Sequence, residues 1–217
     1  MSATIKPLDR TGIAARIAQD IPEGWFVNLG IGIPTGVSDH VPLDREVLFH
    51  SENGVIGAGP APAPEDANPY LVNAGTQHIT LRTGGSYVHH ADSFAIARGG
   101  HLDLCVLGAF EVSESGDIAN WARSPNEPIK QVGGAMDLAI GAKRLWVAME
   151  HVTKATGGSR IRTICSYPLT AKGVVKRVYT DLAVLDVTEK GFVVIDMIEG
   201  LTKDELQARS EAELHWS

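Results

Sequence analysis

The sequence predicts an α/β fold in which helices cover both faces of an open, mostly parallel sheet. Short apolar segments alternate with helical segments along most of the chain, and this alternation is typical of parallel strands joined by crossover helices. Two apolar segments, 25–29 and 47–50, end directly in turn sequences. Ligands of such sheets bind beyond the carboxyl ends of the strands, so a site is expected at these turns.

The first half of the chain begins with a predicted helix that Asp9 caps. Its apolar face consists of Ile13, Ala14, Ile17 and Ile21. The strand 25–29 follows, and then a glycine-rich turn, 30–36, in which Pro34 suits the first position of another helix. After the strand 47–50, residues 57–68 are rich in Pro, Ala and Gly, which predicts a loop with polyproline character.

The second half continues the alternation. The expected elements are a helix at 91–98, a central strand at 102–107, a helix at 135–142, a strand at 145–149, a hairpin of 182–187 and 192–197, and a last helix at 203–212. The tail, 210–217, has a weak pattern and no predicted role. We expect a single domain over 1–217, with its core at about 10–205.

Composition favours a cytoplasmic enzyme. With 217 residues, 44% of them hydrophobic, the chain is long enough for one sizeable core. A net charge of −7 argues against nucleic-acid binding, which needs a basic face. No apolar run is long enough to span a membrane, and no signal peptide is expected. Cys105 and Cys165 are expected to be reduced, buried thiols.

Glu52 is the leading candidate for a catalytic residue. It stands just after the apolar strand 47–50, and Gly54 permits a sharp turn behind it. A carboxylate in this position often only caps a neighbouring amide. The residues alone therefore leave a structural and a functional interpretation open.

The string Ser51-Glu52-Asn53-Gly54-Val55-Ile56-Gly57-Ala58-Gly59-Pro60 resembles the signature of family I CoA transferases, in their B subunit or B domain. Further segments resemble that family in the same order: Asn28-Leu29-Gly30-Ile31-Gly32-Ile33-Pro34, Asn73-Ala74-Gly75, Ser93-Phe94, Arg98-Gly99-Gly100-His101-Leu102-Asp103, Gly116-Asp117-Ile118-Ala119-Asn120-Trp121, Gly133-Gly134-Ala135-Met136-Asp137-Leu138, Met149-Glu150-His151 and Pro168-Leu169-Thr170. Together they extend over roughly residues 10 to 205.

The resemblance implies that Glu52 is the nucleophile of a ping-pong CoA transfer through a glutamyl-CoA thioester. Coenzyme A is then a substrate, and no cofactor is expected. The resemblance also implies that the backbone amides of Gly134 and Ala135 face the thioester as oxyanion donors. From the residues alone, the glycine pair 133–134 serves equally well for packing or capping.

Substrate-binding roles are predicted for Asn53, His89, His90, Gly30 and Gly32. The turn at Gly30 lacks the spacing of a dinucleotide fingerprint, so tight packing near the active site is the better interpretation. No metal site is expected at the adjacent histidines. They resemble 3-oxoadipate-type members, and two imidazoles suit the second carboxylate of a dicarboxylic acid. The alternative acceptor is acetoacetate.

The resemblance covers only the B half of the enzyme. It therefore implies a separate A subunit, an active site at the interface, and an α2β2 assembly, with no nucleic-acid or membrane partner. Two other functions are compatible with the sequence: a binding module that has lost catalysis, and a hydrolase that delivers the acyl group to water. The intact sequence around Glu52 disfavours the first.

Overall fold

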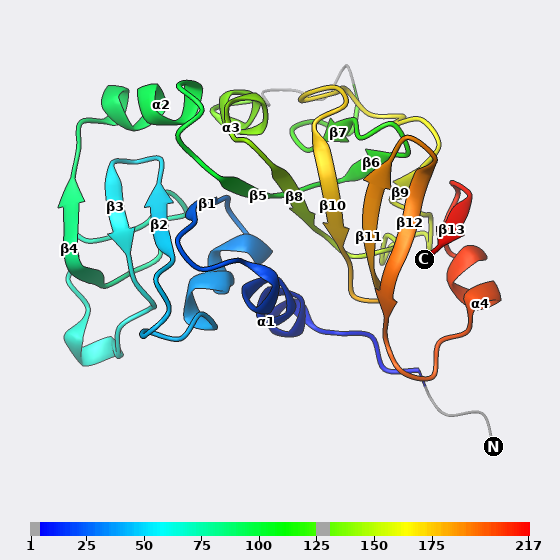
Figure 1. Ribbon diagram of the computed structural model, residues 1–217, viewed down its shortest axis with the longest axis horizontal. Helices are drawn as coiled ribbons and strands as arrows, with labels where there is room; N and C mark the ends of the chain where they lie inside the picture. Colours follow the sequence, from blue (N-terminus) through cyan, green and yellow to red (C-terminus); the bar gives the residue numbers. More distant parts are fainter. Residues whose placement is uncertain (1–4, 125–130) are drawn as a thin grey trace.

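The computed structural model describes residues 5–124 and 131–217. In this part of the chain, one ten-stranded sheet runs through the molecule (Figure 1). Its strands, in spatial order, are β13 (Leu214–Trp216), β12 (Gly191–Met197), β11 (Ala183–Thr188), β10 (Val175–Tyr179), β8 (Leu145–Ala148), β5 (Leu104–Gly108), β1 (Phe26–Leu29), β2 (Leu48–Ser51), β3 (Val55–Ala58) and β4 (Leu81–Tyr87).

The centre of the sheet is parallel, as the alternation of strands and helices predicts. Strands β10, β8, β5, β1 and β2 all pair in parallel. Both flanks contain antiparallel pairs: β11 pairs with β10 and β12, and β3 pairs with β2 and β4. The predicted hairpin of 182–187 and 192–197 is confirmed as β11 and β12.

Helices cover both faces of the sheet. The remaining elements are α1 (Arg10–Asp20), the 3₁₀ helices η1 (Ile33–Asp39) and η2 (Pro64–Asp66), α2 (His90–Arg98), α3 (Ala135–Gly141) and α4 (Lys203–Gln207). Helix α1 lies on one side of the central strands, and α2 and α3 lie on the other (Figure 1). Strand β5 serves both layers, because Leu104 and Val106 pack in the cluster that contains α1 whereas Cys105 and Leu107 pack in the cluster that contains α2 and α3.

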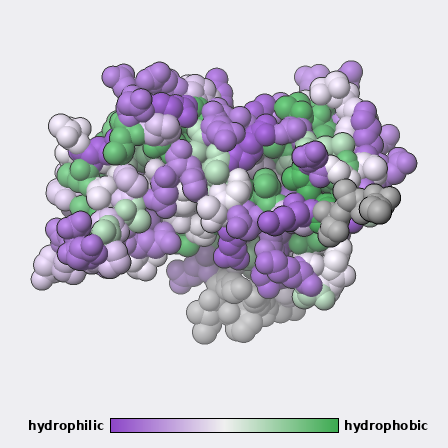
Figure 2. Space-filling model, turned by 90° about the horizontal axis from the view of Figure 1, so that it is seen from below, coloured by the Kyte–Doolittle hydropathy of each residue, from purple (hydrophilic) through white to green (hydrophobic). Residues whose placement is uncertain are grey.

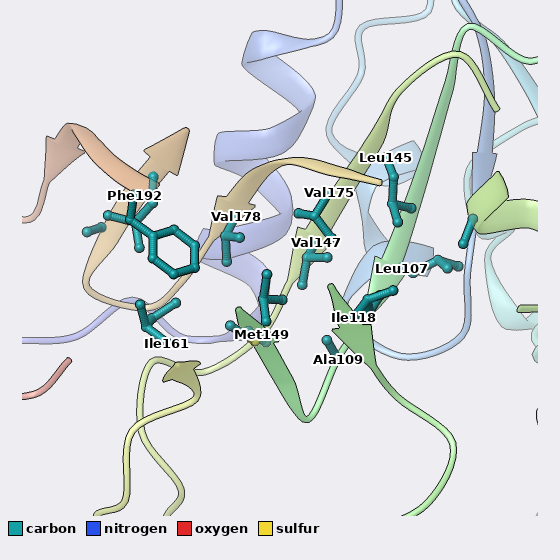
Figure 3. Close-up of a cluster of buried hydrophobic side chains, with 14 of the residues drawn as sticks. Leu107, Ala109, Ile118, Leu145, Val147, Met149, Ile161, Val175, Val178 and Phe192 are labelled. Atoms are coloured by element: carbon teal, nitrogen blue, oxygen red, sulfur yellow. The ribbon is translucent and has the colours of Figure 1, made fainter. Parts of the chain in front are cut away.

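A second, smaller sheet lies over one end of the main sheet. Its strands have the order β7 (Ile118–Ala119), β6 (Glu111–Ser113) and β9 (Ile161–Arg162). Figure 3 shows Ile118 and Ile161 of this sheet directed at Val147, Val178 and other apolar side chains of the main sheet. The small sheet therefore closes the core on this side.

Several boundaries differ from the sequence expectations. Residues 57 and 58 belong to β3 and not to a loop, and the turn after β1 continues into a 3₁₀ helix instead of an α-helix. The last helix ends at Gln207 instead of residue 212, although Thr202 and Glu205 form a capping box at its start. The tail without a predicted role forms β13, which pairs in parallel with β12.

The surface mixes polar and apolar residues. On the face shown in Figure 2, hydrophilic side chains predominate and hydrophobic ones lie between them. Among the residues that the structure describes, no helix combines the length and the apolar character needed to cross a membrane.

Candidate active site

A pocket of about 600 Å³ opens where four neighbouring parallel strands end. Glu52 follows β2, residues 30–33 follow β1, residues 108–110 end β5, and residues 149–150 follow β8. The segment 131–135, which leads into α3, forms another wall. The site therefore lies at the carboxyl ends of parallel strands, where the sequence predicts it.

A tight turn sets the position of Glu52. The amide of Gly54 donates to the carbonyl of Ser51 at 2.9 Å, and the amide of Val88 donates to the carbonyl of Gly54 at 2.9 Å. Gly54 has φ = +113°, and a Cβ there would lie 2.4 Å from the Val88 carbonyl oxygen. Only glycine fits this turn, which leaves the Glu52 side chain half-buried at the rim of the pocket.

A buried polar row lies under Glu52. It consists of Cys105, Asn28 and His50, which are nearly inaccessible to solvent and stand side by side in register on β5, β1 and β2. Asn28 Nδ2 lies 2.9 Å from His50 Nδ1, 3.2 Å from the His50 carbonyl oxygen and 3.3 Å from Glu52 Oε2. Cys105 Sγ donates to Asn28 Oδ1 at 3.5 Å.

The row continues into helix α2. His50 Nε2 lies 2.8 Å from the hydroxyl of Ser93, which is fully buried, and the ring of Phe26 packs edge-on against the imidazole. Burial lowers the pKa of His50 to about 4, although the hydrogen bond with Ser93 opposes this effect. Burial, assisted by the charge of Glu52, holds the pKa of the Cys105 thiol well above its usual value. Both groups are therefore uncharged at neutral pH.

A second buried histidine lies outside the pocket. His151 contacts Thr180 Oγ1 through Nδ1 at 3.0 Å and Ser210 Oγ through Nε2 at 2.8 Å. Burial, and then the charge of Arg209, lower its pKa to about 4. His151 thereby connects β8 to the C-terminal segment, for which the sequence predicts no role.

We expect stability to fall in mild acid because of His50 and His151. The unfolded chain binds protons at these rings near pH 6.5, whereas the folded chain binds them only near pH 4. The stability that the two neutral rings contribute to the fold is complete above pH 6.5 and is lost as the pH falls towards 4. From pH 7 to pH 5, the free energy of unfolding should drop by about 2 kcal/mol for each ring. Urea unfolding at the two pH values measures this, and His151→Asn should reduce the drop by about half. Equal stability at both pH values would contradict it.

The predicted oxyanion donors line the same pocket as Glu52. Gly134 caps α3, and a Cβ there would lie 2.5 Å from the ring of Phe94 on α2. The amide of Ala135 donates to the Val132 carbonyl at 3.4 Å. The Gly134 amide makes no hydrogen bond within the described residues. Of the two predicted donors, Gly134 is the more available.

The predicted substrate-binding residues divide into two groups. Gly30 and Gly32 line the pocket, and Gly30 packs so closely that a Cβ there would lie 2.7 Å from Leu107 Cδ2. Asn53, His89 and His90 are exposed and are absent from the described pocket lining. Asn53 donates to the Val72 carbonyl, His89 caps α2 by accepting from the Ala91 amide, and His90 packs on Phe94.

Other polar residues of the pocket were not among the predicted site residues. Arg10, Arg123 and Arg160 line it, as do Asn120 and Trp121, which stand in one of the segments that resemble the family. The buried amide of Asn28 was likewise not among the predicted site residues. The sequence did offer one signal for Asn28, since it is a polar residue inside the apolar segment 25–29. Buried polar groups require hydrogen-bond partners, which indicates a polar cluster at this position.

Three other acidic residues that follow strands or open helices have structural partners. Glu111 accepts from the amides of Ser166 and Tyr167, and Asp137 forms a two-point ion pair with Arg98. Glu150 borders the pocket and pairs with Lys154. No cluster of metal-ligating side chains occurs in the described part of the chain.

The fold and the pocket define an α/β protein with a carboxylate presented at the ends of parallel strands. Residues 10–208 match the family described as coenzyme A transferase. The chain belongs to this family, and it is a CoA-transferase.

Named relatives agree with this assignment. The chain is 54% identical over 205 residues to the B subunit of 3-oxoadipate CoA-transferase from Pseudomonas putida strain KT2440, covering 94% of this chain and 95% of that protein. It is 45% identical over 204 residues to the B subunit of succinyl-CoA:3-ketoacid coenzyme A transferase from Helicobacter pylori strain 26695, covering 94% and 97%.

A solved structure shares the fold. The apoenzyme of an acyl-CoA transferase from Escherichia coli O157:H7 superimposes with a TM-score of 0.75 at 18% identity. The match covers all of this chain and 43% of that one. This chain therefore corresponds to less than half of the length of that chain.

Proposed function

We propose that the chain is the B subunit of an enzyme that moves coenzyme A from succinyl-CoA to 3-oxoadipate, with Glu52 as the nucleophile. The position of Glu52 carries this proposal: its side chain is half-buried and lines the same pocket of about 600 Å³ as Gly134. Relatives named as B subunits of 3-oxoadipate CoA-transferase, at 50% and 54% identity, support the choice of acceptor.

The proposed reaction has two symmetrical halves. The Glu52 carboxylate attacks the carbonyl of succinyl-CoA, giving a mixed anhydride and the CoA thiolate. The thiolate then attacks the glutamyl carbonyl, so that succinate leaves and a glutamyl-CoA thioester remains. The carboxylate of the acceptor acid attacks this thioester, and the released thiolate attacks the acyl carbonyl of the new anhydride. The products are the new acyl-CoA and a free Glu52 carboxylate.

The pocket suits anionic substrates. Each half-reaction passes through tetrahedral oxyanions, and we propose the amide of Gly134 as a donor that stabilises them. The positive charges of Arg10, Arg123 and Arg160, which line the same pocket, support the binding of substrate carboxylates, and Arg160 also pairs with Glu150 at 3.5 Å. Acetoacetate is the second candidate acceptor, because the Helicobacter pylori relative at 45% identity is named for 3-ketoacids.

The partner in this proposal is a separate A subunit. The named bacterial relatives are designated B subunits, and this chain spans 43% of the chain of the Escherichia coli acyl-CoA transferase. We propose an α2β2 assembly in which the A subunit completes the pocket at the interface.

Mass spectrometry of the complex with its A subunit tests the proposal directly. Incubation with succinyl-CoA should add the mass of coenzyme A less one water to the peptide that contains Glu52. Hydroxylamine should then release coenzyme A as its free thiol and leave a hydroxamate on Glu52. The control is the same incubation with free succinate and coenzyme A. A complex that transfers coenzyme A without ever modifying Glu52 contradicts the proposed nucleophile.

The choice of acid gives a separate prediction for His89 and His90. If these exposed imidazoles receive the second carboxylate, the double replacement His89→Ala/His90→Ala should lower kcat/KM for 3-oxoadipate about tenfold relative to acetoacetate. Loss of the His89 cap alone should lower the stability of the fold by about 1 kcal/mol. Because this changes only the amount of folded enzyme, it should affect the measured rates with both acceptors equally. An unchanged preference between the two acids would rule out the role.

A further inference from the structure

Asn28 must hold one particular orientation beneath Glu52. Its Nδ2 atom faces the His50 carbonyl oxygen and Glu52 Oε2, which are both acceptors. A flipped amide would place Oδ1 against these two oxygens and lose both interactions. On the other side, the Cys105 thiol donates to Oδ1. Neighbours on both sides therefore direct the amide hydrogens towards His50 and Glu52.

The orientation of Asn28 fixes the tautomer of His50. Because the pKa of His50 is lowered to about 4, the ring is neutral at pH 7 and carries one proton. Asn28 Nδ2 can only donate, so Nδ1 must accept, and the proton resides on Nε2. Nε2 then donates to Ser93 Oγ at 2.8 Å.

We propose that His50 is a positioning residue for the nucleophile, acting through Asn28. The imidazole, held between Ser93 and Phe26, anchors the Asn28 amide, and the amide holds Glu52 Oε2. The second carboxylate oxygen, Oε1, accepts no hydrogen bond within the described residues, so we assign it as the attacking oxygen. This inference rests on the proposed role of Glu52.

The arrangement also suits the changing charge on Glu52. Asn28 Nδ2 has two hydrogens and lies within 3.3 Å of three acceptors, of which Glu52 Oε2 is the most distant. The contact to Glu52 can therefore strengthen when a tetrahedral oxyanion forms and relax when the neutral thioester replaces it. Because His50 holds the Asn28 amide in place, the amide can stabilise the oxyanion without first reorienting.

Single-turnover formation of the glutamyl-CoA thioester tests the role, using the complex with its A subunit and succinyl-CoA. For His50→Phe, which removes the acceptor at Nδ1, we expect the rate constant to fall about 10- to 100-fold while KM changes less than threefold. His50→Asn, whose side-chain oxygen can replace Nδ1 as acceptor, should recover the rate to within about fivefold of the original.

The matched control is His151→Asn, which alters a fully buried histidine outside the pocket. It should lower stability and leave the rate constant per folded molecule unchanged. If His50→Phe does not fold, Ser93→Ala serves instead, with an expected loss of about three- to tenfold in the same rate constant.

The outcomes separate the two proposals. If the original complex forms no thioester on Glu52, the proposed function fails. If it does, and the His50 variants react at the original rate, or His50→Asn loses as much rate as His50→Phe, the positioning role fails.

Discussion

Replacing Glu52 with glutamine should abolish CoA transfer, lowering kcat by roughly 10⁴-fold or more, which is at least about 5 kcal/mol of transition-state stabilisation. The amide is nearly isosteric with the carboxylate, so the fold and the contact with Asn28 should persist. A neutral amide cannot attack a thioester, and neither the anhydride nor the glutamyl thioester can form. Steady-state formation of the new acyl-CoA, with the complex at known concentration, measures the effect.

Glu46→Gln is the matched control for this prediction. Glu46 is exposed and lies two residues before β2, at the opposite end of the strand from Glu52. Its replacement should leave kcat within about twofold, since surface substitutions rarely matter. Glu52→Asp, which shortens the side chain by one methylene, should also be severely impaired. Substantial transfer by either Glu52 variant would refute the role of this residue.

Replacing Gly54 with alanine should be the most damaging single-methyl change near the site. A Cβ at this position would lie 2.4 Å from the backbone oxygen of Val88, and φ = +113° is outside the regions open to alanine. We expect the free energy of unfolding to fall by about 3 kcal/mol or more. In the fraction that folds, the turn must shift and carry Glu52 with it, so kcat should fall at least about 100-fold.

Gly24→Ala separates the steric clash from the backbone preference. Gly24 also has a positive φ, +80°, but a Cβ there would meet no atom within 4 Å. It should lower stability by only about 1 kcal/mol and leave kcat unchanged. Urea unfolding and single-turnover rates of both variants provide the comparison. If the two variants are equally stable and equally active, the close contact with Val88 does not constrain the turn.

Four of the five parallel strands, β1, β2, β5 and β8, were accessible from sequence as apolar segments that alternate with helices. The fifth, β10, was not among the expected elements. The antiparallel flank β3–β4 was not accessible either, because Gly57 and Ala58 lie in a Pro- and Gly-rich stretch that hides a strand. The small sheet was equally inaccessible. Its strands β7 and β9 have two residues each, too few to show a period of two.

The site was predictable only in part for a similar reason. Glu52 and Gly134 stand in local motifs, and the pocket brings them together. Asn28, His50 and Ser93 belong to three elements far apart in the sequence, and their contacts depend on strand register and on where α2 packs. For His89 and His90, adjacency in the sequence did not show that the two side chains have different surroundings. The His89 side chain caps α2, whereas the His90 ring lies on Phe94.

The polar row of Cys105, Asn28 and His50 also bears on how the chain selects its native strand alignment. The three side chains meet only because Asn28 stands opposite both others in the parallel register. Sliding β1 by one residue would turn the Asn28 amide to the opposite, apolar face of the sheet, with an unpaired amide costing about 1–3 kcal/mol. Compact states in which β1 is out of register are therefore less stable. The same strand alignment thus gives the native fold and places Asn28 beneath Glu52.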